Sequence, residues 1–202
     1  RVLAGSRKDF PSEILRERGS KLKSIIDEVQ RYDIQEKEEI LCKKMAESAV
    51  KILDFKMARL RLLDRKQQNL ITVATAGIPC DDAFKLDGEV MPLSTLTPFL
   101  VDKFKVEQSY LIQTDEIVWN NIVENHFYVS SKSQENREWK SNNALITPLI
   151  AHGQMIGILT LDDPKYGNTP SKQAIESVGV FASAAGWTLA LSRAHQIGRA
   201  HV

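Results

Sequence analysis

Cysteine is the side chain of this sequence best suited to covalent chemistry, and it occurs at Cys42 and Cys80 only. Cys80 is followed by Asp81 and Asp82, and neighbouring carboxylates raise the pKa of a thiol rather than lower it. Cys42 falls within a predicted helix far away in the sequence. Two such thiols do not make a disulfide framework, so we expect both to be reduced, as in a cytoplasmic protein.

Histidines and paired acids could supply metal ligands or acid–base groups. Four histidines are present without metal-ligand spacing: His126, His152, His195 and His201. Asp162 and Asp163 follow a predicted strand, where adjacent side chains point to opposite faces, so we expect them to accept hydrogen bonds from loop or helix-start amides. The sequence contains no glycine-rich phosphate loop, serine nucleophile elbow or kinase signature. It therefore predicts neither an enzyme nor a metal site, with a haem or iron role for His126 as the alternative.

Aromatic side chains in a long polar segment, residues 115–140, are the best candidates for a ligand pocket. Trp119, Phe127 and Trp139 lie in this segment, and Tyr110 belongs to a short predicted strand just before it. We expect these four side chains to form the pocket walls, which would favour a flat or amphipathic ligand. The alternative is a surface excursion in which the aromatic side chains only anchor the loop.

The composition is that of a soluble globular protein, with 202 residues, 43% hydrophobic and 26% charged residues. This length predicts one domain and an extension. A net charge of +1 offers no basic field for nucleic acid and no polybasic membrane anchor. The apolar stretches 141–161 and 177–192 are expected to be buried core rather than membrane spans. Because the sequence does not begin with Met, we expect it to be a fragment of a longer protein or to have a trimmed N-terminus.

The N-terminal residues 1–33 have the pattern of a helical arm. Leu15, Leu22 and Val29 recur every seven residues, and Ile25 and Tyr32 each follow three residues after the last two. This is the seam of a short coiled coil, so we expect a homodimer formed through the arm. The alternative is a lone amphipathic helix lying on its own domain.

Residues 34–197 are expected to form the main domain, followed by a short tail, 198–202. Hydrophobic periodicity predicts helices over residues 34–53 and 169–196, a short helix over 93–104, and strands over 58–63, 70–76, 110–112, 144–151 and 155–161. In the first strand Arg59 and Arg61 alternate with apolar residues, which predicts one wet face. Pro148 predicts an edge position or a local bulge. The small residues Gly179, Ser183, Gly186 and Ala190 predict close approach of another helix.

These elements resemble the GAF domain, a small-molecule sensor module of bacterial and archaeal signalling proteins. The resemblance lies mainly in residues 144–191, where the segment IGILTLDDP is followed by TPS and an Ala-rich final helix. The segment QSYLI over 108–112 is similar to one branch that is often attached to histidine kinases. The family implies an α+β fold with an antiparallel sheet of about six strands, terminal helices packed on one face, and a pocket roofed by the variable middle segment.

The resemblance also implies a function and its alternatives. We expect a non-enzymatic sensory domain that binds a small molecule under residues 115–140 and relays binding through dimeric terminal helices to an output domain outside this fragment. One alternative is a ligand-free dimerisation and relay module. Another is a redox enzyme of the free methionine sulfoxide reductase type, which the two separate cysteines disfavour. Bilin attachment at Cys80 is disfavoured too, because the next histidine is His126. The Asn-Lys-Phe-Asp-Glu set linked to cyclic nucleotides is not found, and the cofactor stays unknown.

Overall fold

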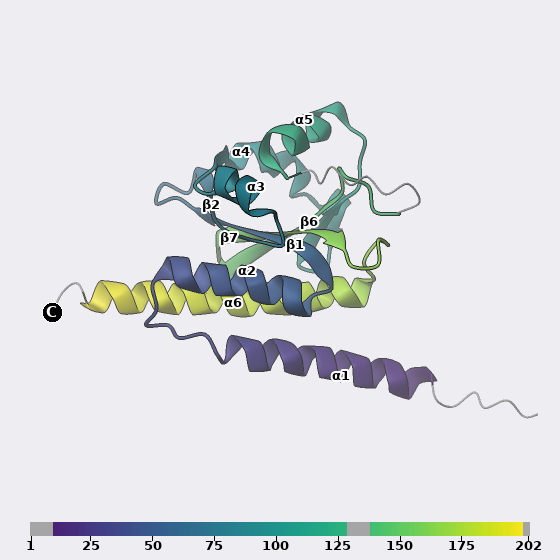
Figure 1. Ribbon diagram of the computed structural model, residues 1–202, viewed down its shortest axis with the longest axis horizontal. Helices are drawn as coiled ribbons and strands as arrows, with labels where there is room; N and C mark the ends of the chain where they lie inside the picture. Colours follow the sequence, from purple (N-terminus) through teal and green to yellow (C-terminus); the bar gives the residue numbers. More distant parts are fainter. Residues whose placement is uncertain (1–9, 129–137, 200–202) are drawn as a thin grey trace, which may run out of the picture.

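The computed structural model describes residues 10–128 and 138–199. Within these residues the helices and strands follow the chain in this order: α1 Phe10–Val29, α2 Glu38–Ile52, β1 Phe55–Leu63, β2 Asn69–Ala76, α3 Cys80–Leu86, β3 Val90–Pro92, α4 Leu93–Leu96, β4 Lys105–Val106, β5 Ser109–Ile112, α5 Ile117–His126, β6 Ala144–Ala151, β7 Gln154–Pro164 and α6 Lys172–Arg199. Helices α2 and α6 cover one face of a sheet, and α3, α4 and α5 cover the other (Figure 1). The architecture is the expected α+β arrangement.

The sheet has seven strands in the order β3-β2-β1-β7-β6-β5-β4. All of its pairings are antiparallel. The expectation of about six strands was one too low, and the shortest strand, β4, has only two residues. The long strands β1 and β7 lie side by side near the middle, so side chains from both can meet over the centre of either face.

Two hydrophobic cores stabilise the sheet, one on each face. Leu145, Leu159 and Leu161 belong to the core beneath the terminal helices. Ile146 and Ile158 belong to the second core, under α4 and α5. The two strands of the β6–β7 hairpin therefore contribute alternate residues to opposite cores. This confirms that the apolar hairpin is covered on both faces, as its nearly continuous hydrophobic sequence predicts.

The β6–β7 hairpin turns at His152 and Gly153, which both have positive φ, 52° and 73°. A two-residue turn of this kind matches the twist of the strands. Pro148 lies in an interior strand, but the pairing of β6 with β5 extends only from Ala144 to Ile146. A register shift against β7 follows at Leu149/Ile150. The expected bulge is present, and the proline lies past the last paired residue of β5.

The two largest differences from the sequence predictions concern the face of the sheet under α3–α5. Residues 115–140 contain the helix α5, which the mixed sequence did not reveal. The predicted helix over 93–104 is broken into α4 and two 3₁₀ turns, Thr97–Phe99 and Asp102–Phe104. Because these elements cover β1, Arg59 and Arg61 are 4% and 0% exposed, and the predicted wet face is wrong.

Helix α6 packs closely on the sheet. The Oγ of Ser171 accepts a hydrogen bond from the Ala174 amide at 3.2 Å, so Ser171 caps the helix, which begins slightly later than the predicted residue 169. A Cβ added at Gly186 would lie 2.8 Å from the carbonyl oxygen of Ile150 in β6. The small residues thus allow a strand, rather than the expected second helix, to come close.

By length and composition alone, α6 could cross a membrane, but more than half of its most apolar stretch is buried within the protein. Such a helix is weak support for a membrane span, because the core helix of a globular domain has the same composition. The finding agrees with the expectation that residues 177–192 form buried core.

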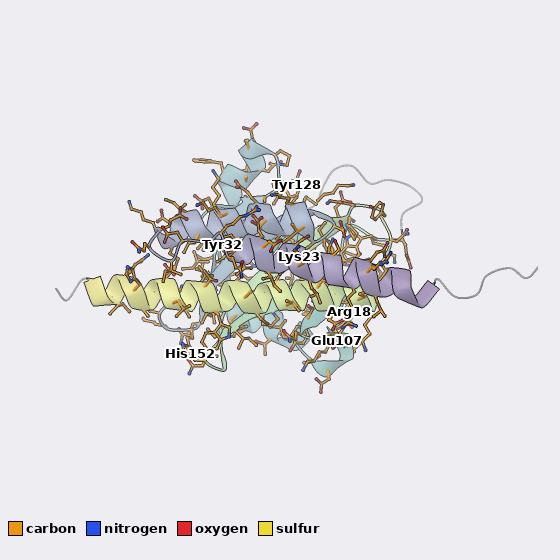
Figure 2. All side chains as sticks on the ribbon, turned by 90° about the horizontal axis from the view of Figure 1, so that it is seen from below. Arg18, Lys23, Tyr32, Glu107, Tyr128 and His152 are labelled. Atoms are coloured by element: carbon orange, nitrogen blue, oxygen red, sulfur yellow. The ribbon has the colours of Figure 1, made fainter. Side chains whose placement is uncertain are left out.

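Helix α1 runs alongside α6 in the same direction (Figures 1 and 2). Ile25 and Tyr32 are buried against their own domain, and Arg18 forms an ion pair with Glu176 at 2.5 Å. Burial raises the pKa of Tyr32 to about 12. Leu15, however, is 67% exposed. The C-terminal part of the heptad seam therefore packs within the domain, as the lone-helix alternative has it, while Leu15 near its N-terminal end is left uncovered.

Candidate functional site

A small cavity lies between the centre of the sheet and the chain that follows α5. Its volume is about 20 Å³, close to the space that one water molecule needs. Strands β1 and β7 form its floor, and the residues just after α5 form its wall. Its lining includes Met57, Arg59, Phe127, Tyr128, Thr160 and Asp162.

The pairing of β1 with β7 brings the polar lining residues together. Arg59 is paired with Thr160, and Met57 with Asp162. Paired residues of antiparallel strands present their side chains on the same face, here the face covered by α3–α5. The Oγ1 of Thr160 is buried and has no hydrogen-bond partner among the described residues. The cavity therefore has an unused polar group on its floor.

Two buried arginines, Arg59 and Arg61, lie next to this cavity. The Arg59 guanidinium donates to Glu89 Oε2 at 2.8 Å, to Thr72 Oγ1 at 2.9 Å and to the His126 carbonyl oxygen at 2.6 Å. Arg61 Nη2 donates to the same His126 carbonyl oxygen. Both guanidinium groups thus converge on one oxygen at the C-terminal end of α5.

Arg61 is less well satisfied than Arg59. Its Nε lies 3.7 Å from Glu89 Oε2, which is an ion pair but too long for a hydrogen bond. Neither Nε nor Nη1 of Arg61 has a hydrogen-bond partner in the described part of the chain. The Cζ of Arg61 lies 5.0 Å from the centroid of the Phe127 ring, so the guanidinium contacts a wall of the cavity through a cation–π interaction.

The electrostatics of the pair follow from burial. Burial lowers the pKa of Arg59 to about 10, and burial together with the charge of Arg59 lowers the pKa of Arg61 to about 9. Both stay charged at neutral pH. Glu89 is the carboxylate that both arginines contact, and its Oε1 also lies 2.6 Å from His126 Nδ1. The cluster therefore carries more positive than negative charge.

Asp162 supplies a carboxyl group, a hydrogen-bond acceptor, to the lining of the cavity. Burial raises the pKa of its carboxyl group to about 6, an effect that two hydrogen bonds partly offset. Its Oδ1 accepts from Trp139 Nε1 and from the Asp163 amide, each at 2.6 Å. The Asp163 amide belongs to β7 itself, so Asp162 accepts from a strand amide and not from the loop or helix-start amides that were expected.

The four aromatic residues proposed as pocket walls lie in different surroundings. Phe127 lines the cavity. Trp139 contacts a lining residue, Asp162, and packs edge-on against Phe55. Trp119 is fully buried in the second core. Its ring packs edge-on against Phe127, with centroids 5.4 Å apart. Tyr110 is half-buried and packs on the second core from β5.

Sequence reasoning missed the polar part of the site. Arg59, Arg61 and Thr160 lie in strands whose burial on both faces depends on the covering helices. Glu89 lies in a loop that precedes β3 and follows no motif. The alternation of arginine with leucine in β1 was the one available signal, and it was interpreted as a solvent-exposed face.

The cysteines are not brought together. Cys42 belongs to the core beneath the terminal helices, and burial raises the pKa of its thiol to about 12. Cys80 is exposed at the start of α3, on the opposite face of the sheet. Within residues 10–128 and 138–199, no group of three His, Cys, Asp or Glu side chains could hold a metal ion.

Comparisons with known proteins agree with the fold. A family model described as "GAF domain" matches residues 38–189. The GAF domain of a sensor histidine kinase from Pseudomonas syringae pv. tomato is 16% identical, with a TM-score of 0.58 over 95% of this chain and 99% of that one. No curated protein matches the chain in sequence.

Two further solved structures are similar to the chain. The phycoerythrobilin-bound GAF domain of a cyanobacterial phytochrome is 10% identical, with a TM-score of 0.61 over 89% of this chain and 97% of that one. The GAF domain of an Acinetobacter phosphoenolpyruvate-protein phosphotransferase is 14% identical, with a TM-score of 0.58 over 87% of this chain and 93% of that one. Identities this low show a shared fold and nothing about ligands.

Proposed function

The chain belongs to the GAF domain family, and on this premise we propose that it is a non-enzymatic sensory domain whose ligand is a small molecule bound between β1, β7 and the end of α5. Binding there is passed through dimeric terminal helices to an output domain outside residues 1–202. The observation that carries the proposal is a cavity with a buried hydroxyl group, that of Thr160, which lacks a hydrogen-bond partner among the described residues, next to two buried arginines. Buried polar groups are normally paired, so unpaired ones beside a cavity favour a missing ligand.

The cavity is smaller than a ligand, so binding requires the wall to move. Phe127 and Tyr128, which line it, follow directly after α5. Trp119, in the middle of α5, packs against Phe127. An outward shift of this one helix end would enlarge the space over Thr160 and Asp162. In this proposal the moving wall is the end of α5 with Phe127 and Tyr128, which belong to the segment under which the sequence predicts the ligand, and Tyr110 supports it from β5.

Binding at this face can reach the terminal helices through few contacts. Thr160 and Asp162 lie on β7, which pairs with β6, and Gly186 of α6 packs directly on Ile150 of β6. A shift of these strands would alter the position in which α6 packs on the sheet. A ligand that binds better to one of two such positions would shift the populations of the two helix arrangements.

The surface of α6 supports the dimer. Val180, Ala184, Trp187 and Leu191 follow one another at spacings of four, three and four residues, the pattern of a coiled-coil seam. Val180, Trp187 and Leu191 are 36%, 46% and 52% exposed in the single chain. Helix α1 runs alongside α6 (Figure 2), and it carries a further exposed apolar side chain, Leu15. Pairing of two copies through this surface would cover it.

One experiment tests the ligand directly. Protein purified without added ligand is examined by native mass spectrometry and by absorption spectroscopy. We expect a mass above that of the polypeptide, or absorbance beyond the protein band, together with a dimer. A dimer of unmodified mass that binds nothing in a subsequent screen would favour the ligand-free relay module, the second candidate, which the small cavity volume supports. A monomer would contradict the dimer.

A further inference from the structure

We propose that the ligand of this site is a small oxyanion, a carboxylate or phosphate group, which binds to Arg59 and Arg61 in place of the His126 carbonyl oxygen. The inference rests on the proposed function and names the chemical class that the site would recognise. It is carried by the convergence of two buried guanidinium groups on one oxygen atom.

The charge of the cluster favours an anion. Arg59 and Arg61 bring two positive charges into the interior, and Glu89, the carboxylate within contact of both, balances one of them. An uncompensated buried charge is strongly unfavourable, because the interior solvates it poorly. A bound anion would neutralise the excess charge of these three side chains, provided that it binds at the guanidinium groups and not over the Asp162 carboxyl group, which is ionised above about pH 6. Burial and the neighbouring guanidinium, which lower the pKa of Arg61, are the same two unfavourable influences that an anion would relieve.

The geometry already places donors around an oxygen atom. Arg59 Nη1 lies 2.6 Å from the His126 carbonyl oxygen, and Arg61 Nη2 donates to the same atom. His126 is the last residue of α5, so its carbonyl has no partner within the helix and lies at the negative end of the helix dipole. This oxygen has a partial charge only. An oxyanion carries a full charge, and hydrogen bonds between charged groups are roughly twice as strong as neutral ones.

Unused donors remain for the other oxygens of the ligand. Among the residues that the structure describes, Arg61 Nε and Nη1 have no hydrogen-bond partner, and neither has the Thr160 hydroxyl group at the cavity floor. Because Phe127 contacts both the cavity and the Arg61 guanidinium, an anion entering there would meet both features.

Replacement of the His126 carbonyl oxygen by an oxygen of the ligand would also release the end of α5. In the present structure the two arginines hold this helix end through its carbonyl group. Once an oxyanion takes both donors, Phe127 and Tyr128 lose this restraint and the wall can open around the ligand. The anion would thus provide both the binding energy and the movement that the sensor function requires.

The test measures thermal unfolding and calorimetric binding with two probes, inorganic phosphate and sodium acetate, each against sodium chloride at equal ionic strength and pH 7.5. We expect at least one probe to raise the midpoint saturably, by about 5–10 °C at one hundred times its dissociation constant. If only phosphate, or only acetate, raises the midpoint, that probe is the oxyanion that the site prefers. Arg61→Met should weaken that binding at least tenfold, whereas Arg65→Met, at an exposed arginine in the β1–β2 turn, should leave it unchanged.

Arg61→Met could fail to fold, so a second variant keeps the inference testable. Glu89→Gln removes the competing carboxylate and should tighten binding of the effective probe about tenfold. The inference is overturned if neither probe stabilises the protein more than chloride does, or if binding is equal in wild type and Glu89→Gln. If an uncharged molecule co-purifies and binds without dependence on Arg61, the sensor function stands and the oxyanion is wrong. If no molecule of any charge binds, both are wrong.

Discussion

The indole Nε1 of Trp139 donates a hydrogen bond to Asp162 Oδ1 at 2.6 Å. This contact joins a side chain in the first core to a carboxyl group at the floor of the cavity. The same Oδ1 accepts from the Asp163 amide. The carboxyl group is therefore oriented through one of its oxygens, while burial still raises its pKa to about 6.

Asp162→Asn should stabilise the protein at neutral pH. The folded protein raises the pKa of Asp162 from 3.8 to about 6, so the folded state holds this proton more tightly than the unfolded state. The stability that the protonated carboxyl group contributes to the folded state is fully present below about pH 4 and is lost as the pH rises through 6. At pH 7 the ionised group costs about 2–3 kcal/mol. The asparagine Oδ1 can accept both present hydrogen bonds, so the variant should gain roughly that amount.

The measurement is urea unfolding of wild type and Asp162→Asn between pH 4 and pH 8, with the exposed Asp81→Asn as the matched control. We expect the difference between wild type and Asp162→Asn to grow with pH and to level off above pH 7. A constant difference across this range would show that the carboxyl group titrates alike in the folded and unfolded states.

The fold could largely be predicted from the sequence, because periodicity reports burial within one element. The 7-residue recurrence of Leu15, Leu22 and Val29 predicted a helix, and the apolar hairpin 144–161 predicted strands covered on both faces. Short elements such as β4, with two residues, are beyond this approach since they exist only through pairing with β5. The order of the predicted elements already indicated helices at both ends of the chain over an antiparallel sheet, whereas periodicity could not supply the strand order β3-β2-β1-β7-β6-β5-β4.

The candidate site was harder to predict, for a reason that Arg59 and Trp119 illustrate. A strand with arginine at alternate positions has the same pattern whether the polar face meets solvent or a second layer, and only the covering helices decide which. Aromatic side chains suggest a pocket, yet Trp119 buries its ring in the core with its Nε1 donating to the Asn142 carbonyl. Of the four predicted wall residues, Phe127 alone is among the side chains that line the cavity.

Gly186→Ala should destabilise the domain, although alanine favours helices. Its Cβ would lie 2.8 Å from the Ile150 carbonyl oxygen and 3.0 Å from the Ile150 amide nitrogen, both in the backbone of β6. Separating α6 from the strand should cost about 1–3 kcal/mol, as overpacking does. At Gly19 in α1 nothing lies within 4 Å of an added Cβ, so Gly19→Ala should stabilise by about 0.5–1 kcal/mol.

Thermal and urea unfolding of both glycine variants check this pair of expectations. A loss of stability in Gly186→Ala together with a gain in Gly19→Ala would show that α6 packs closely on β6 because residue 186 has no side chain. If both variants are more stable than wild type, the sheet accommodates the added methyl group at residue 186. The contact between α6 and β6 would then be too loose for the proposed path from β7 through β6 to α6.

The double variant Trp187→Lys and Leu191→Lys should convert dimers to monomers. Both side chains are about half exposed in the single chain, so lysine there would place like charges opposite one another in a pair of α6 helices without disturbing the core. Leu22 and Val29 are less suitable positions, because they are half-buried against their own domain. Phe84→Lys, on α3 at the opposite face and 83% exposed, is the control.

Sedimentation velocity over a range of concentrations measures the outcome of these lysine substitutions. We expect dimers for wild type and Phe84→Lys and monomers for the double variant, with unchanged circular dichroism. A double variant that stays dimeric would place the interface away from α6.

Glu89→Gln should destabilise the protein, and added oxyanion should restore part of the loss. Glu89 Oε2 contacts Arg59 at 2.8 Å and Arg61 at 3.7 Å, and both guanidinium groups are buried. Removing the carboxylate leaves two positive charges facing each other, a loss of about 3–5 kcal/mol for a buried pair. Urea unfolding with and without the probe that stabilises wild type measures both quantities. A larger gain from the probe in Glu89→Gln than in wild type is expected, because the anion then replaces the missing negative charge. Equal gains would mean that the probe binds away from the arginines, and that Glu89 serves the fold alone.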